Sequence, residues 1–364
     1  EIDPSLRQFG QAVRRRLVGL DVESRTGHCN AIGLAPSAHD HLVVWENAME
    51  AVVVHAPQDL RVEEFEVPDS EQGRNDVTVR VERGGICGSD LHYYHNGGFG
   101  TVRIREPMVL GHEVSGTVQS VGADVEGLRK GDRVAVSPSQ PCNTCEYCLR
   151  GQQAHCLDML FYGSAMRFPH VQGAFRDELV ANEAQCFKVY SSLTAGEAAM
   201  AEPLAVCLHA VNRAGALVGK KVLITGSGPI GVLCAAAARR AGVVEIAATD
   251  IASFPLKMME QIGVDHAFDV AKSPDALKPF AQNKGTFDVM FEASGNESAL
   301  VGAFDALRPG ATIVQVGLGG DVTLPMNTVV AKEFVLKGTF RFHEEFETAV
   351  AMMNNGLIDV SPLI

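Results

Sequence analysis

Apolar and polar positions alternate with a period of two over the first part of the chain. From Met49 to about Lys188, short apolar runs are interrupted by polar residues and glycines, as in Val77-Thr-Val-Arg-Val81. This alternation is typical of strands that bury one face. We therefore predict a partly open β-barrel here, with the chemical motifs on its loops.

The second half of the chain has the pattern of strands followed by helices. A run typical of a buried strand, Lys221–Thr225, precedes a glycine-rich turn and an alanine-rich helix that ends near Arg240. A further strand follows at Val243–Thr249, and later ones at Phe287–Gly295 and Thr312–Gly317. Strand runs without alternation are typical of a parallel sheet covered by helices. The predicted fold class is therefore α/β, with a Rossmann-type, doubly wound parallel sheet after the barrel.

These patterns predict where the domains begin and end. Residues 1–48 show no sustained periodicity, and we expect them to be an extension outside the fold. An arginine-rich targeting leader is the alternative, although acidic residues are as frequent there as arginines. Residues 49–192 are predicted to form the barrel domain, and residues 193–336 the dinucleotide-binding domain.

Composition excludes several classes of partner. The 364 residues, 46% hydrophobic and 21% charged, suffice for two compact cores. A net charge of -13 argues against nucleic acid, because binding it requires a clustered excess of Lys and Arg. No tract of about 18 consecutive apolar residues is present, which argues against a membrane partner. A small-molecule substrate is the expected partner.

Four of the nine cysteines lie close together with C-x2-C-x2-C-x7-C spacing. This spacing is typical of a tetrahedral metal site in a reducing compartment, so we expect a structural zinc and a cytoplasmic protein. An iron–sulfur cluster is the alternative, because ferredoxins also use C-x2-C-x2-C runs. The predicted ligands are Cys142, Cys145, Cys148 and Cys156.

A second candidate metal site lies earlier in the chain. Gly-Gly-Ile-Cys87-Gly-Ser-Asp-Leu-His92 is followed by Gly-His112-Glu113. A thiolate, an imidazole and a carboxylate are all zinc ligands, and three protein ligands leave one coordination position open, as catalytic zinc sites do. We therefore predict a catalytic zinc bound by Cys87, His112 and Glu113.

The glycine-rich turn indicates a dinucleotide. It joins a predicted strand to a predicted helix, so its backbone can approach a pyrophosphate at the helix N-terminus. Asp250 follows about 20 residues later and is predicted to bind the adenosine ribose, which favours NAD. Asp250 could instead cap the next helix, and nearby Lys257 leaves NADP open. The predicted cofactor-binding residues are Gly226, Gly228, Pro229, Ile230, Gly231 and Asp250.

Three residues after a later predicted strand are candidates for the nicotinamide end of the cofactor. Dinucleotides lie across the carboxyl ends of parallel strands. Simple strand termination at glycine is the alternative explanation for each of these residues. They are Val316, Gly317 and Leu318.

The order of these motifs, with Ala201-Glu202-Pro-Leu-Ala between them, resembles the zinc-dependent medium-chain alcohol and polyol dehydrogenases. The resemblance covers nearly everything from Met49 to Ile364. It implies a GroES-like catalytic domain, a Rossmann coenzyme domain, a homo-oligomer of two or four subunits, and hydride transfer between a secondary alcohol and NAD(P). It also implies that residues 337–364 return to the catalytic domain. That return needs more chain, so we expect the sequence to be truncated.

The resemblance further implies catalytic roles. Glu202 matches a position near the metal in polyol enzymes, and whether it binds zinc directly or through water stays open. Ser89 is expected to accept the alcohol proton and His92 to pass it toward solvent. Capping of the helix nearby is the alternative for Ser89.

The resemblance also bears on the substrate. Segments 161–170 and 337–346 are most similar to members that oxidise a sugar acid, with polyol and threonine-type enzymes as alternatives. A dinucleotide-binding protein without catalysis is the alternative from another class. Phe342 departs from sorbitol dehydrogenases, which tend to have tyrosine there. The expected contacts are Tyr93 and Arg341 for the substrate, Arg167 and His170 as candidates for its carboxylate, and Phe340 for the cofactor.

Overall fold

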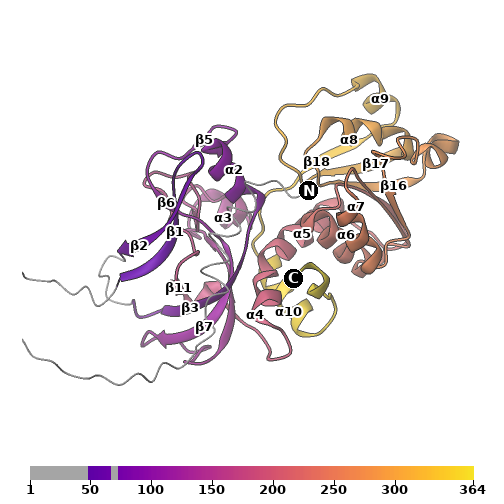
Figure 1. Cartoon of the computed structure of the whole chain (residues 1–364). Helices are drawn as coiled ribbons and strands as arrows, with labels where there is room; N and C mark the ends of the chain where they lie inside the picture. The colour runs from indigo at the N-terminus through magenta and orange to yellow at the C-terminus, as the bar shows by residue number, and fades with distance from the viewer. Residues whose placement is uncertain (1–47, 67–72) are drawn as a thin grey trace, which may run out of the picture.

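The computed structural model describes residues 48–66 and 73–364, so the predicted extension at residues 1–48 lies almost entirely outside the described residues. Figure 1 shows two units, an antiparallel one and one built on a parallel sheet with helices. The predicted α/β fold class is therefore confirmed.

Two antiparallel sheets form the first unit, with strand orders β2-β1-β6 and β11-β3-β7-β8-β12. The alternation seen in the sequence sets their faces, since Val77, Val79 and Val81 of β3 are all buried. The strands of these sheets are β1 (Ala48–Ala56), β2 (Asp59–Glu66), β3 (Asp76–Gly85), β6 (Met108–Val109), β7 (Glu113–Val121), β8 (Arg133–Val136), β11 (Glu178–Asn182) and β12 (Cys186–Lys188).

Shorter elements on the loops of this unit carry the motifs. Helix α2 follows β3, and the four-cysteine segment, which we call the cysteine lobe (residues 142–156), lies between β9 and β10. Their bounds are α2 (Gly88–Asn96), β4 (Gly98–Phe99), β5 (Val102–Arg103), β9 (Ser139–Gln140), α3 (Glu146–Leu149), η1 (Gln153–His155), β10 (Leu160–Phe161) and η2 (Glu183–Gln185).

The second unit is a six-stranded parallel sheet in the order β15-β14-β13-β16-β17-β18. This order reverses direction at β13, as in doubly wound dinucleotide-binding sheets, where ligands lie at the reversal. Its strands are β13 (Lys221–Thr225), β14 (Glu245–Asp250), β15 (His266–Asp269), β16 (Phe287–Glu292), β17 (Leu307–Gln315) and β18 (Val335–Gly338).

Helices cover this sheet and connect it to the first unit. Helix α5 packs against α6 and α10, and α4 contacts β3 and β7. The helices are α4 (Ala195–Ala199), α5 (Ala201–Ala214), α6 (Pro229–Arg240), α7 (Ser253–Gln261), η3 (Lys278–Lys284), α8 (Glu297–Gly302), η4 (Phe304–Ala306), α9 (Met326–Ala331), α10 (Glu345–Asn354) and η5 (Ser361–Leu363). Within the described ranges, no helix has the length and apolarity that crossing a membrane requires.

Residues 337–364 begin in the parallel sheet and end beside the first unit. The start of this segment completes β18, and α10 then packs on α5. Asn354, at the end of α10, accepts a hydrogen bond from the Tyr190 N–H (2.8 Å) and donates one to the Lys188 carbonyl (3.1 Å). The segment therefore links the two units.

Candidate active site

Strand pairing brings the three candidate zinc ligands together. β3 and β7 are antiparallel, with Gly85 opposite Glu113. Cys87 follows the end of β3 and His112 precedes the start of β7, so both lie at the same edge of the sheet. The ligand atoms of Cys87, His112 and Glu113 all lie within 4.8 Å of one another. Strand pairing thus brings residues that are more than twenty positions apart in the sequence into one compact set of donor atoms.

Asp90 fixes the geometry of this donor set. Its carboxylate, fully buried, accepts hydrogen bonds from the backbone N–H groups of Cys87 (3.0 Å) and Gly111 (3.3 Å). It also lies 3.7 Å from His112 Nδ1. Sequence reasoning missed Asp90. The signal was present, because a carboxylate three residues after a helix N-cap is the capping-box pattern.

The donor set fits a metal cation. His112 Nδ1 is buried and makes no hydrogen bond within the described part of the chain. Burial and the neighbouring Glu113 raise the pKa of the Cys87 thiol to about 12, and burial raises the pKa of Glu113 to about 7. A cation at the site would reverse both effects, because it stabilises the anionic forms that bind it.

Glu202 lies beside this set, outside the group whose ligand atoms are within 4.8 Å of one another. It occupies the first turn of α5 and is 5% exposed. Burial raises its pKa well above the usual range, and the nearby charges of Glu113, Cys87 and Asp90 add to the effect. Burial thus favours the protonated form of this carboxyl group, against the opposing charge of His112.

The predicted proton-transfer residues lie on α2. Cys87 is the N-cap of α2, so Ser89 lies in the first turn and does not occupy the capping position. Ser89 and His92 are three residues apart, a spacing that places side chains on one face of a helix. Tyr93 is 1% exposed, and its hydroxyl accepts a hydrogen bond from the Ala165 N–H (3.0 Å).

A pocket of about 410 Å³ contains both candidate arginines. Phe161 lines this pocket, and the centroid of its ring lies 5.6 Å from the centroid of the His112 ring. The Arg341 guanidinium lies 4.0 Å above the Phe161 ring, and burial lowers its pKa to about 10, so it stays protonated at neutral pH. Arg167 forms an ion pair with Asp158 (2.7 Å) at the pocket.

His170 and Phe342, which were also considered for the substrate pocket, contact other parts of the protein. The His170 ring accepts a hydrogen bond from the Arg105 N–H (2.8 Å), and its Nδ1 lies 2.8 Å from the Arg167 carbonyl. Both ring nitrogens are therefore engaged with backbone groups. Phe342 is 1% exposed and packs against Phe346 of α10, so its side chain belongs to the core.

The cysteine lobe has tetrahedral metal geometry. Sγ separations are 3.4 Å for Cys142–Cys156 and 4.0 Å for both Cys142–Cys148 and Cys145–Cys156. A tetrahedron with Zn–S bonds of about 2.3 Å has edges of about 3.8 Å, whereas a disulfide bond is about 2.05 Å. Hydrogen bonds from Thr144 lower the pKa of Cys142 to about 6, which favours the thiolate. The lobe therefore fits a single tetrahedral zinc.

The glycine-rich turn joins β13 to α6, with Pro229, Ile230 and Gly231 in the first turn of the helix. A Cβ on Gly231 would lie 1.9 Å from the Gly226 carbonyl oxygen, whereas a Cβ on Gly228 would meet nothing within 4 Å. The turn is thus packed tightly at Gly231 and open at Gly228. That open face is where a pyrophosphate needs access.

Asp250 ends β14 and bonds to the turn. Its carboxylate accepts hydrogen bonds from the N–H groups of Ser227 (2.7 Å) and Ala252 (2.8 Å). Asp250 therefore holds the glycine turn and also bonds the residue before α7. Contact with a ribose is compatible with this arrangement, because each carboxylate oxygen retains a second lone pair.

Glu292 organises the nicotinamide end of the predicted site. This residue is fully buried at the end of β16. Its carboxylate accepts hydrogen bonds from the Gly295 N–H (3.0 Å) and from the Gln315 side chain. Its carbonyl accepts from the N–H groups of Val316 and Gly317, both at 2.8 Å. Leu318 follows, 67% exposed. Sequence reasoning missed Glu292, since an acidic residue in an apolar strand has no spacing signature.

Comparison with known proteins decides the family. Residues 73–191 match the alcohol dehydrogenase GroES-like domain, and residues 229–355 match the zinc-binding dehydrogenase family. The chain belongs to the zinc-binding dehydrogenases. It is therefore an oxidoreductase that uses zinc and a nicotinamide dinucleotide, and the GroES-like and Rossmann folds predicted from its sequence are confirmed.

Several members of this family are similar along most of the chain. L-idonate 5-dehydrogenase (NAD(P)(+)) of Escherichia coli is 43% identical over 291 residues, which cover 80% of this chain and 84% of that protein. Sorbitol dehydrogenase of Homo sapiens is 36% identical over 318 residues, covering 86% and 87%. A crystal structure of the Escherichia coli L-idonate 5-dehydrogenase superposes with a TM-score of 0.82 at 40% identity, covering 87% and 90%.

Proposed function

We propose that this dehydrogenase oxidises a secondary alcohol of a sugar acid, with L-idonate converted to 5-keto-D-gluconate and NAD+ reduced to NADH. The similarity to L-idonate 5-dehydrogenase supports this substrate class. The proposal includes a homo-oligomeric enzyme. It also includes a cytoplasmic location, which is supported by the finding that none of the eight described cysteines forms a disulfide bond.

The observation that carries the proposal is the position of Arg341. Its guanidinium lies over Phe161, whose ring contacts His112, and no described carboxylate forms an ion pair with it, although the charge of Glu202 acts to raise its pKa. Its one hydrogen bond is to a weak acceptor, the Met166 sulfur (3.1 Å). A desolvated guanidinium without an anionic partner favours a substrate carboxylate. Arg167, already paired with Asp158, is proposed as a second contact at the rim.

The bound cofactors would supply a Lewis acid for the alcohol oxygen and a hydride acceptor. In the proposed arrangement, the protein orients the substrate through Tyr93 and Arg341. Ser89 accepts the alcohol proton, and His92, one turn later on α2, passes it toward solvent.

The proposed ligands follow from the geometry already described. Cys87, His112 and Glu113 would hold the catalytic zinc, with Glu202 at its edge. The structural zinc would bind the cysteine lobe. The proposed dinucleotide contacts are Gly226, Gly228, Pro229, Ile230, Gly231, Asp250, Val316, Gly317, Leu318 and Phe340, and the Asp250 carboxylate favours NAD over NADP by repelling a 2′-phosphate.

The test is an initial-rate assay at the NADH absorbance band. Purified enzyme is compared on L-idonate, sorbitol and L-threonine, and in reverse on 5-keto-D-gluconate, with and without a zinc chelator. We expect the highest kcat/KM on L-idonate and loss of activity with chelator. A clear preference for sorbitol would refute the substrate, and activity that survives complete zinc removal would refute the chemistry.

A polyol is the second candidate substrate. It is favoured by the similarity to sorbitol dehydrogenase and by the hydroxyl group of Ser164 in the pocket, which can bond neutral hydroxyls. Arg341→Met separates the two candidates. For a sugar acid, we expect this substitution to raise KM by about 10-fold or more, because a charge-assisted contact is worth about 1.5–3 kcal/mol. For a polyol the increase should be smaller.

A further inference from the structure

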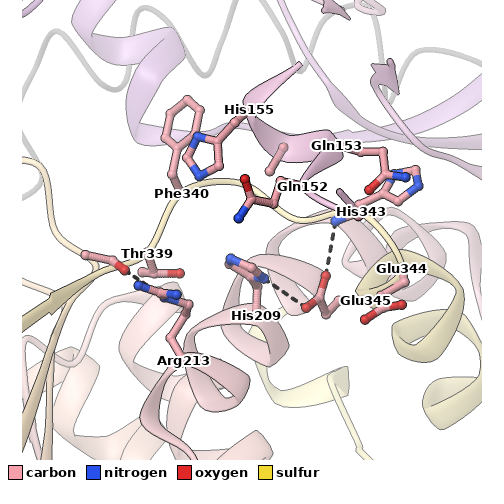
Figure 2. Close-up of a pocket in the computed structure, with 13 residues that line it drawn as sticks. Gln152, Gln153, His155, His209, Arg213, Thr339, Phe340, His343, Glu344 and Glu345 are labelled. Carbon is pink, nitrogen blue, oxygen red and sulfur yellow. Dashed lines mark hydrogen bonds and ion pairs between the residues drawn. The ribbon is translucent and has the colours of Figure 1, made fainter. Parts of the chain in front are cut away.

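A second pocket, of about 670 Å³, lies on the other side of the Phe340 segment. It is formed by the cysteine lobe, α5 and the chain between β18 and α10 (Figure 2). His155 and Phe340 line both this pocket and the smaller pocket that contains Arg167 and Arg341. These two rings therefore form part of the wall between the pockets.

Planar groups run in series from the cysteine lobe to His112. The His155 ring is stacked on Phe340, with centroids 6.0 Å apart and planes at 21° (Figure 2). The Arg341 guanidinium lies 5.0 Å from the Phe340 centroid and 4.0 Å from that of Phe161. Phe161 in turn lies 5.6 Å from His112. The series has the order His155, Phe340, Arg341, Phe161, His112.

Arg341 depends on these rings for its position. Its backbone has φ of +54°, a left-handed conformation that a long side chain adopts only when its surroundings impose it. Its guanidinium has no carboxylate partner in the described chain. The Phe161 and Phe340 rings and the Met166 sulfur are its described contacts, and cation–π attraction to the two rings helps to set its orientation.

His155 supplies the outer support of this series. It ends η1, immediately before Cys156, so the fold of the cysteine lobe fixes its position. Tyr147 of α3 lies behind it, with ring centroids 6.5 Å apart. Without the His155 ring, Phe340 would face an open pocket on that side.

We propose that His155 is a positioning residue. The cysteine lobe fixes the His155 ring, this ring supports Phe340, and Phe340 helps to hold the Arg341 guanidinium, which sets how tightly the substrate is bound. The proposal rests on the substrate role proposed for Arg341. It gives the lobe a function beyond stability, because one of its side chains completes the wall of the substrate pocket.

The test compares His155→Ala, His155→Phe and the control Gln153→Ala, a change in the same short helix and pocket but without a ring contact. We expect His155→Ala to raise the substrate KM by about three- to tenfold, with kcat within about twofold. His155→Phe should restore KM, and Gln153→Ala should match wild type. Zinc content, measured by mass spectrometry, should equal wild type in all three.

A crystal structure of His155→Ala gives a readout that does not depend on activity. Displacement of the Arg341 guanidinium from the Phe161 face would support the proposal. An unmoved Arg341, an unchanged KM, failure of His155→Phe to restore KM, or zinc loss accounting for the defect would each overturn it.

Arg341→Met, assayed in parallel, separates this proposal from the proposed function. If Arg341→Met raises KM and His155→Ala does not, only the role of His155 fails. If neither substitution changes KM, the substrate role of Arg341 fails as well.

Discussion

At the scale of single residues, the predicted zinc ligands are held in place by the carboxylate of Asp90, which is not itself a predicted ligand. Asp90 bonds the backbone beside Cys87 and beside His112, so one buried side chain positions both ends of the donor set. Groups behind metal ligands set ligand orientation and basicity, and their loss typically costs about 10–100-fold in metal affinity or activity.

We predict that Asp90→Asn weakens zinc binding at the catalytic site by about 10–100-fold. An amide can replace one acceptor, but its NH2 group would face a backbone N–H donor. Competition with a chelator, followed by metal analysis, measures the change. Asp275→Asn, which alters an exposed ion pair, is the matched control. Wild-type zinc affinity in Asp90→Asn would contradict this role.

Gly228 and Gly231 allow a paired prediction about the dinucleotide. Gly228→Ala should leave the free energy of unfolding within about 0.5 kcal/mol of wild type, because its Cβ enters open space. It should still raise the Kd for NADH by about tenfold, since the methyl group would stand where the pyrophosphate approaches.

Gly231→Ala should instead lower stability, because its Cβ would collide with the Gly226 carbonyl. Thermal unfolding and NADH fluorescence titration of both variants are the measurements. Unchanged NADH affinity in Gly228→Ala would show that the cofactor lies elsewhere.

Single residues could be predicted from the sequence where their side-chain chemistry is typical of one kind of site. Cys87, His112 and Glu113 could be selected from sequence because their donor atoms are typical of zinc sites, and the structure brings them together. Asp90 and Glu292 were missed because their partners are mostly backbone groups, which leave no residue-type pattern.

At the scale of elements, β3 and β7 form the catalytic edge through their register, and α5 and α10 join the two units. A buried polar contact links these helices, since Glu345 Oε1 lies 2.8 Å from His209 Nδ1 (Figure 2). The same oxygen lies 3.0 Å from Asn212 Nδ2. Burial acts to raise the pKa of Glu345, but hydrogen bonds from His209, the His343 N–H and Asn212 outweigh it and lower the pKa to about 2.

This contact predicts a pH-dependent contribution to stability. A lowered carboxyl pKa stabilises the folded state above its unfolded value of 4.5, and the contribution is lost as pH falls from there toward about 2. Glu345→Gln should therefore lower the free energy of unfolding by about 1–2 kcal/mol at pH 7.5, and by less at pH 4.

Denaturant unfolding of wild type, Glu345→Gln and the exposed neighbour Glu344→Gln provides the comparison. Glu344→Gln should match wild type at both pH values. An equal deficit for Glu345→Gln at the two pH values would show that its charge is not responsible.

Elements were more predictable than their contacts. The run Lys221–Thr225 is β13 as expected, because its apolar centre, Val222–Ile224, is buried on both faces. The packing of α10 on α5 was not predicted, since the contact between Glu345 and His209 joins residues 136 positions apart and depends on tertiary packing alone.

At the scale of the whole molecule, zinc ligands and dinucleotide turn belong to different units. The donor set lies at one edge of the antiparallel sheet, and the turn lies between β13 and α6 of the parallel sheet. The pocket lined by Arg341 could not be predicted from sequence, because it needs the segment after β18 to lie against Phe161, which belongs to the other unit.

This separation predicts that zinc removal and cofactor binding are largely independent. Chelator-treated enzyme should lose activity but bind NADH with a Kd within about threefold of wild type, since no zinc ligand belongs to the glycine turn. Fluorescence titration measures the affinity, and added zinc should restore turnover. Loss of NADH binding together with zinc would indicate that the two sites are coupled.

The central claim is that Cys87, His112 and Glu113 hold a catalytic zinc. A crystal structure with anomalous diffraction collected on both sides of the zinc absorption edge tests it most directly. The account predicts two zinc peaks per chain, one among the four cysteines and one within about 2.0–2.3 Å of the donor atoms of Cys87, His112 and Glu113. A zinc-loaded, active crystal without a peak at this second position would contradict it.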